Sequence, residues 1–231
     1  MEEAVRYTLK TLIRQALNSY EVELKGLREV ESRLPWMCTY TLEWILYCKQ
    51  MEINYFSGQH DVTLQLQLLA TNLHELLQNP GPNSNLITLT LHMLHLTREL
   101  QAHQITSVLD YEWQTVIRYY FEDDVVMRSL GGQFEWGGEY QGVWQVMVNT
   151  KDIRRAYATV LGGLNWGLGV VMQGPSGTGK TETLKELARS MARFCLVFNC
   201  SSLVSTRLLQ KRLAGLCYTG SWICLDELNR L

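Results

Sequence analysis

The segment from Gly174 to Thr181 has the composition of a loop that binds the phosphates of a nucleotide. It reads Gly-Pro-Ser-Gly-Thr-Gly-Lys-Thr and fits the pattern G-x-x-x-x-G-K-[ST] at every fixed position. Backbone N–H groups must wrap a triphosphate closely, and glycines permit that approach because they have no side chain. The residues expected to bind the nucleotide are Gly174, Pro175, Ser176, Gly177, Thr178, Gly179, Lys180 and Thr181.

Two side chains at the end of this loop have specific expected roles toward ATP. The Lys180 ammonium would reach the β- and γ-phosphates and act in catalysis, and the Thr181 hydroxyl would coordinate Mg²⁺. Both stand where a helix should begin, and a helix N-terminus adds a positive field that favours phosphate. The loop therefore predicts a site for ATP and Mg²⁺.

A carboxylate pair further along the chain supplies the second half of such a site. The apolar run Trp-Ile-Cys-Leu, beginning at Trp222, predicts a buried strand that ends in Asp226 and Glu227. In open α/β sheets ligands sit at this edge, so we expect Asp226 to hold Mg²⁺ and Glu227 to act as general base. Asn199, at the end of another expected strand, should point toward the same edge. The alternative is an ordinary solvated strand end.

The elements around these motifs alternate as a nucleotide-binding α/β module requires. A β-branched run over residues 168–173 predicts a buried parallel strand before the loop, and apolar residues at helical spacing predict a helix after it. A strand over 194–199 and a helix over 203–217 then lead to the strand that starts at Trp222. The pattern favours the parallel sheet of a P-loop NTPase.

The first half of the chain has the periodicity of helices instead. Apolar residues predict helices over 5–24, 39–55, 62–78 and 110–121, with a loop over 79–85. Residues 86–100 alternate in part as a strand would, but the longer span fits a helix. We expect a helical segment over residues 1–121 and the nucleotide-binding module over 122–231.

Glycines and aromatic residues set residues 125–148 apart from both halves. Phe134, Trp136, Tyr140 and Trp144 lie at even separations, which is typical of a β-hairpin or short meander. These aromatic side chains could form a ligand platform, but cross-strand packing is the commoner use. A helix over 152–161 and a turn over 162–167 should follow.

Composition narrows the classes of partner. The hydrophobic fraction of 46% is ample for a core, and the net charge of -2 provides no basic surface for nucleic acid or an anionic membrane. No apolar run approaches membrane-spanning length, and the charged start predicts no secretory signal. The six cysteines form no C-x-x-C pair and are expected to be buried and reduced. His92, His95 and His103 lack further ligands at metal-binding spacing, so we expect ordinary helix-surface histidines.

Several longer motifs resemble the dynein heavy chains, at the first AAA+ module. They are Gln-Gly-Pro-Ser-Gly-Thr-Gly-Lys-Thr-Glu-Thr (173–183), Val-Phe-Asn-Cys-Ser (197–201) and Asp-Glu-Leu-Asn-Arg (226–230). Upstream, Tyr-Glu-Trp (111–113), Ile-Arg-Tyr-Tyr (117–120) and Gln-Phe-Glu-Trp-Gly-Gly-Glu-Tyr (133–140) resemble the dynein segment that joins the mechanical linker to this module. Over residues 1–110 the resemblance rests on helical character and position.

The resemblance implies a microtubule motor ATPase in which ATP turnover in the first module drives the linker. It also implies dynein intermediate, light intermediate and light chains as partners, and microtubule binding through a stalk that lies elsewhere. The setting would be the cytoplasm and cytoskeleton, or the axoneme of a cilium or flagellum. The fold class it implies is α + α/β, a helical linker segment followed by a truncated AAA+ parallel sheet with a β-hairpin at its start.

The chain departs from the dynein pattern at two motifs. Dyneins usually have Phe-Asp-Glu-Phe-Asn-Arg-Ile where this chain has leucines around the acidic pair, and Thr-Pro-Leu-Thr-Asp where residues 148–152 match only at Asp152. The departures suit a divergent member, such as the dynein heavy chain domain-containing type. The resemblance also places a fourth strand, a polar sensor, a helical lid and a neighbour's arginine after these residues, so little or no turnover is expected from this chain alone.

Three function classes remain open at this point. The chain is a fragment or short isoform of a dynein-like ATPase, or a non-hydrolysing nucleotide-binding scaffold or assembly protein of the dynein system. The third class is a helical interaction module whose attached half-module is vestigial. Nucleotide binding separates the third class from the other two.

Overall fold

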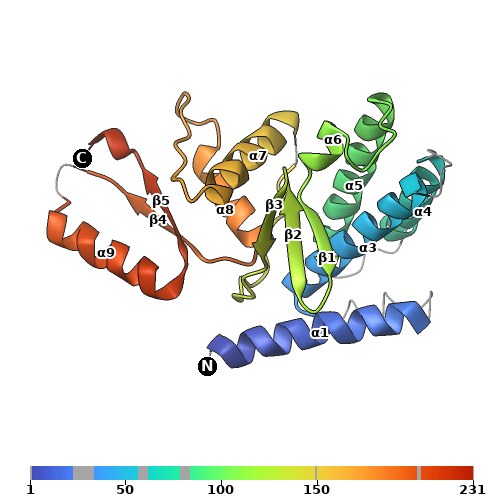
Figure 1. The fold of residues 1–231 in the computed structure, drawn as a ribbon, viewed down its shortest axis with the longest axis horizontal. Coiled ribbons are helices and arrows are strands. Elements are labelled where there is room, and N and C mark those ends of the chain that lie inside the picture. The colour runs from blue at the N-terminus through green and yellow to red at the C-terminus, as the bar shows by residue number, and fades with distance from the viewer. Residues whose placement is uncertain are drawn as a thin grey trace.

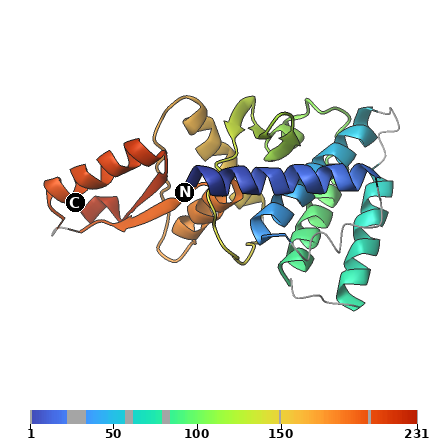
Figure 2. The same ribbon diagram turned by 90° about the horizontal axis from the view of Figure 1, so that it is seen from below.

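The computed structural model describes residues 2–22, 34–56, 62–78, 84–148, 150–201 and 204–230. A helical segment is followed by a small antiparallel sheet and then by helices and parallel strands that form part of an AAA+ α/β module (Figure 1). Seen in Figures 1 and 2, the strands β4 (Cys195–Asn199) and β5 (Trp222–Asp226) and the helix α9 (Thr206–Thr219) lie at one end of the molecule, away from the helices between Trp36 and Ala102. The predicted fold class, α + α/β, is confirmed.

The predicted N-terminal helices are present. They are α1 (Glu2–Val22), α3 (Trp36–Phe56), α4 (Thr63–Gln78) and α5 (Ser84–Ala102). The choice of a helix for residues 86–100 is confirmed, but the loop predicted over 79–85 is wrong at its end, because α5 already begins at Ser84. Residues 23–24 and 79–83 of these predictions lie outside the described part. Helix α3 is buried on nearly every side, with Met37, Leu42 and Met51 almost fully enclosed, so it forms the centre of the core.

The helix predicted over residues 110–121 is wrong in its second half. Only α6 (Tyr111–Gln114) is helical, and β1 (Arg118–Phe121) pairs antiparallel with β2 (Val125–Ser129), which pairs with β3 (Gly132–Glu135). The aromatic residues of β1 fit a half-buried pleated surface, where Tyr119 faces Met127 in the ladder and both are buried. The predicted meander is confirmed for residues 125–135, whereas 136–148 form no strand.

The predicted division at residues 121 and 122 falls in the turn between β1 and β2. Buried residues on both sides of it belong to one continuous hydrophobic cluster, which includes Trp44, Tyr119, Trp144 and Leu187. The division into two domains stays a prediction.

The expectation that the cysteines are buried holds for four of them and fails for one. Cys38, Cys48, Cys200 and Cys224 are buried free thiols, whereas Cys195 is half-buried and Cys217 is exposed. Burial raises the pKa of Cys48 to about 12.

The residues after β3 run along the C-terminal end of α8 (Lys180–Ser190). The Gly137 N–H donates to Met191 O at 2.9 Å, and the Glu139 N–H donates to Ala192 O at 3.0 Å. A β-carbon at Gly137 would lie 2.3 Å from Ala192 O, closer than any real contact. The Trp-Gly-Gly-Glu motif therefore has a structural reason, because only glycine lets this backbone reach the helix end.

The strand predicted over residues 168–173 is absent. After α7 (Lys151–Asn165), which extends past the predicted turn at 162, these residues continue as irregular chain, with Leu168 61% and Val171 72% exposed. Strand β4 pairs with β5 in parallel, and no described strand runs beside 168–173. A strand needs a hydrogen-bonding neighbour, so a β-branched run without one stays irregular.

Candidate nucleotide-binding site

The loop from Gly174 to Thr181 turns through two glycines in the left-handed backbone region. Gly177 has φ +79° and Gly179 has φ +77°, a conformation that side chains disfavour. Gly179 is also the residue directly before α8, so the loop delivers its backbone to a helix N-terminus. The predicted order of loop and helix is confirmed, and a helix N-terminus is favourable for phosphate.

The Lys180 side chain lies over the loop that precedes it. Its Nζ donates to Gly174 O at 2.9 Å and to Pro175 O at 2.6 Å, and lies 3.4 Å from Thr178 Oγ1. The Thr178 hydroxyl in turn donates to Pro175 O at 2.9 Å. The ammonium group is therefore held among the residues expected to wrap the phosphates.

Thr181 and Asp226 meet although they are far apart in the sequence. The Thr181 hydroxyl donates to Asp226 Oδ2 at 3.1 Å, which joins the first turn of α8 to the end of β5. Asn199 is the register partner of Asp226 across the β4–β5 ladder, so it lies at the same sheet edge, as the sequence predicts. Hydroxyl and carboxylate oxygens are the ligands that Mg²⁺ prefers, so this pair fits the ion.

Glu227 lies beside Asp226 in a constrained turn. It has φ +52°, and its N–H donates to Asp226 Oδ1 at 3.1 Å. Its carboxylate forms an ion pair with Arg230, with 2.5 Å between Oε2 and Nε. The sequence prediction did not include Arg230 in the site, although Arg230 is three positions after Glu227 and one helical turn brings residues at this spacing together.

Among the aromatic residues singled out in the sequence, the buried ones act in packing. Trp136 and Trp144 are 2% and 6% exposed, and the Trp144 ring packs on Trp36 and Tyr40 of α3, with centroids 6.0 and 5.5 Å apart. Tyr140 is exposed. Packing is therefore supported for the two tryptophans, but it is not the predicted cross-strand packing, because neither residue lies in a strand and Trp144 packs on a helix.

Burial and the neighbouring His95 lower the pKa of His92 to about 4. Within the described ranges, no group of three or more His, Cys, Asp or Glu side chains is arranged to hold a metal ion.

None of the described helices combines the length and apolar character needed to cross a membrane.

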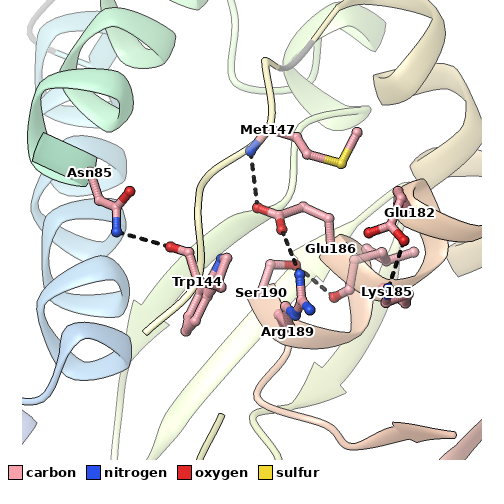
Figure 3. A network of polar contacts seen from close by, with 9 residues as sticks. Asn85, Trp144, Met147, Glu182, Lys185, Glu186, Arg189 and Ser190 are labelled. Carbon is pink, nitrogen blue, oxygen red and sulfur yellow. Dashed lines mark hydrogen bonds and ion pairs between the residues drawn. The ribbon is translucent and has the colours of Figure 1, made fainter. Parts of the chain in front are cut away.

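Glu186 is a further charged residue near the site that sequence reasoning missed. It lies in the middle of α8, only 4% exposed, and its Oε1 accepts from the Met147 N–H at 3.5 Å (Figure 3). Burial raises its pKa, and the Met147 N–H, Arg189 and the Trp144 indole partly offset that effect. Hydrophobic periodicity gives no signal for such a residue, because a charged side chain is expected on the exposed face of a helix.

Comparison with known proteins identifies the family. Residues 136–231 match the family model described as "Hydrolytic ATP binding site of dynein motor region". Human "Dynein axonemal heavy chain 6" is 31% identical over 248 aligned residues that include all of this chain and 6% of the relative. The chain belongs to the dynein heavy chain family. The resemblance stated from the sequence motifs is thereby confirmed.

Other dynein heavy chains of different kinds are similar to this chain. Mouse "Dynein axonemal heavy chain 1" is 38% identical over 149 residues, which are 64% of this chain and 4% of the relative. The "Dynein heavy chain, cytoplasmic" of Caenorhabditis elegans is 34% identical over 204 residues, 81% of this chain and 4% of the relative. This dynein heavy chain sequence thus spans 4–6% of the length of the three relatives named.

Proposed function

We propose that this chain binds ATP with Mg²⁺ as the nucleotide-binding part of a dynein-type motor ATPase. The observation that carries the proposal is the 3.1 Å contact between Thr181 Oγ1 and Asp226 Oδ2, because it joins two separately predicted half-sites into one. The match of residues 136–231 to a dynein ATP-binding region supports it. The nucleotide-binding residues are those of the loop from Gly174 to Thr181.

Each group has a role that follows from its chemistry. The loop N–H groups and the Lys180 ammonium bind the phosphates, and Thr181 and Asp226 hold Mg²⁺. The ion, when bound, neutralises phosphate charge. Glu227 is the group placed to take a proton from an attacking water, for which it must leave the ion pair with Arg230.

In the complete protein, ATP hydrolysis would drive movement of the linker, to which residues 1–121 belong. Its companions would be dynein intermediate, light intermediate and light chains, and microtubules would bind through the stalk. Relatives named axonemal, cytoplasmic and flagellar inner arm support a cytoskeletal setting, which includes the cilium. This chain by itself is expected to show little or no turnover.

A second function is favoured by the state of Glu227. Its carboxylate pairs with Arg230, an arrangement that suits a protein that holds a nucleotide without hydrolysing it, as a scaffold or assembly protein of the dynein system. If the chain hydrolysed ATP at an appreciable rate and Glu227→Gln abolished that hydrolysis, this alternative would be contradicted. The expectation that the chain by itself is inactive would be contradicted as well.

The test of nucleotide binding is titration with a fluorescent ATP analogue, with and without Mg²⁺. Lys180→Ala should weaken binding about 10- to 100-fold, because charge-assisted hydrogen bonds contribute roughly 1.5–3 kcal/mol. Lys185→Ala is the matched control, since Lys185 lies on the same helix and pairs with Glu182 at 2.6 Å. Equal affinity of Lys180→Ala and the parent chain, or no binding by either, would reject the proposal and leave the helical interaction module.

A further inference from the structure

The carboxylate of Glu186 is buried where an uncharged side chain would cost less. Its Oε2 lies 3.9 Å from Arg189 Nη1 and meets no hydrogen-bond donor among the described residues. Removing a carboxylate from water is unfavourable unless its oxygens are paired. Beyond its own helix, the carboxylate interacts with the Met147 N–H and with the Trp144 indole, and both belong to the segment of residues 144–147. This segment therefore indicates what the residue is for.

The segment that Glu186 contacts is also held by the helical half of the chain. Asn85, at the start of α5, donates from Nδ2 to Trp144 O at 2.9 Å, and the Trp144 ring packs against Trp36 and Tyr40 of α3. In Figure 3, Asn85, Trp144, Met147 and Glu186 follow one another from α5 to α8. Residues 144–147 thus lie between the helix that begins at Lys180 and the N-terminal helices.

We propose that Glu186 is a positioning residue that couples the nucleotide loop to helices α3 and α5. A nucleotide bound at the N-terminus of α8 restrains that helix, and α8 transmits the restraint through Glu186 to residues 144–147. The Asn85 side chain and the Trp144 ring carry it onward to α5 and α3. This inference rests on the proposed binding of ATP.

Two substitutions separate coupling from simple packing. Glu186→Gln keeps the size of the side chain and an oxygen that accepts from Met147 N–H, whereas Glu186→Met keeps a similar size without any acceptor. Both replacements have helix propensities close to that of glutamate, so α8 itself should be preserved. A residue that only fills space tolerates both changes, and a residue that positions through its acceptor tolerates only the first.

The experiment is amide hydrogen exchange of the whole chain with and without Mg²⁺ and ATP. In the parent chain and in Glu186→Gln, nucleotide should slow exchange several-fold both in residues 174–183 and at the start of α5. In Glu186→Met the slowing should persist in 174–183 and disappear from α5. The inference would be overturned if nucleotide slowed exchange at the start of α5 as much in Glu186→Met as in the parent chain. It would also be overturned if residues 174–183 of the parent chain were protected while exchange in α5 was not slowed. No slowing in 174–183 of the parent chain would count against nucleotide binding itself.

A second measurement requires no nucleotide. Asn85→Ala and Glu186→Met each release one side of residues 144–147, so their effects on the equilibrium constant of unfolding should be non-additive. The change in this constant in the double variant should differ at least about 3-fold from the product of the two single changes. Additive effects would overturn the coupling even if the nucleotide does not bind. The corresponding cycle with Glu186→Gln should be closer to additive.

Discussion

Replacing Gly137 with alanine tests whether residues 136–139 are docked on the end of α8 as described. The added β-carbon would lie 2.3 Å from Ala192 O. That carbonyl cannot retreat freely, because it accepts the hydrogen bond from Glu139 N–H at 3.0 Å. The segment must therefore move off the helix end, and the bond from Gly137 N–H to Met191 O is strained with it.

The expected cost follows from these contacts. Overpacking of a close interface costs about 1–3 kcal/mol, and loss of one backbone hydrogen bond adds about 1 kcal/mol. Together they predict a loss of roughly 2–4 kcal/mol in the free energy of unfolding. For a chain of this length the melting temperature should fall by about 5–15 °C.

The assay is urea and thermal unfolding followed by circular dichroism, with Gly162→Ala as the control. Gly162 lies within α7, and a β-carbon there would meet nothing within 4 Å. Alanine at that position should stabilise the helix by about 0.5–1 kcal/mol. A free energy of unfolding of Gly137→Ala within about 0.5 kcal/mol of the parent value would show that residues 136–139 are not docked on the end of α8 in this way.

Three further predictions concern polar groups that are buried or partly buried. Tyr119→Phe should lower the free energy of unfolding in urea by about 1 kcal/mol, because the Tyr119 hydroxyl donates to Ser190 O at 3.1 Å in the core. An unchanged unfolding midpoint would contradict that hydrogen bond. Burial raises the pKa of Glu186, so ionisation of this carboxyl destabilises the fold as the pH rises above 4.5, the pKa of the group in the unfolded chain. The stability of Glu186→Gln relative to the parent chain should therefore increase from pH 4 to pH 8. A difference that does not change with pH would contradict the raised pKa. The pKa of His92 is lowered to about 4, so protonation of this side chain destabilises the fold as the pH falls from 6.5 toward 4. His92→Gln should therefore lose less stability than the parent chain over that range. Parallel curves of stability against pH would show that His92 does not contribute to the pH dependence.

Local sequence signals were enough for the N-terminal helices and for the nucleotide loop. The apolar stripes of α1, α3, α4 and α5 repeat within a few residues, and the left-handed turns at Gly177 and Gly179 are possible because glycine accepts them. The pairing of β4 with β5 was also predictable, since a helix joins two apolar runs in order. The helices and the loop depend on residues that are close in the chain.

The strands and the buried charge depended on partners instead. Residues 118–121 became a strand because β2 lies beside them, and residues 168–173 did not because none of the described strands pairs with them. The burial of Glu186 was decided by residues 144–147 packing across α8, and the pairing of Glu227 by the turn that brings Arg230 close. Each outcome required a hydrogen-bonding partner that periodicity does not specify.

The amino-acid sequence alone thus determined the phosphate-binding loop, the acidic pair and the membership of the dynein family, because each depends on residue types at short fixed spacings. The tertiary structure decided that Thr181 meets Asp226, that the Trp-Gly-Gly-Glu motif anchors the end of α8, and that one segment lies between the nucleotide helix and α5. These contacts join residues far apart in the chain. Their geometry depends on how the whole core packs, which no local pattern encodes.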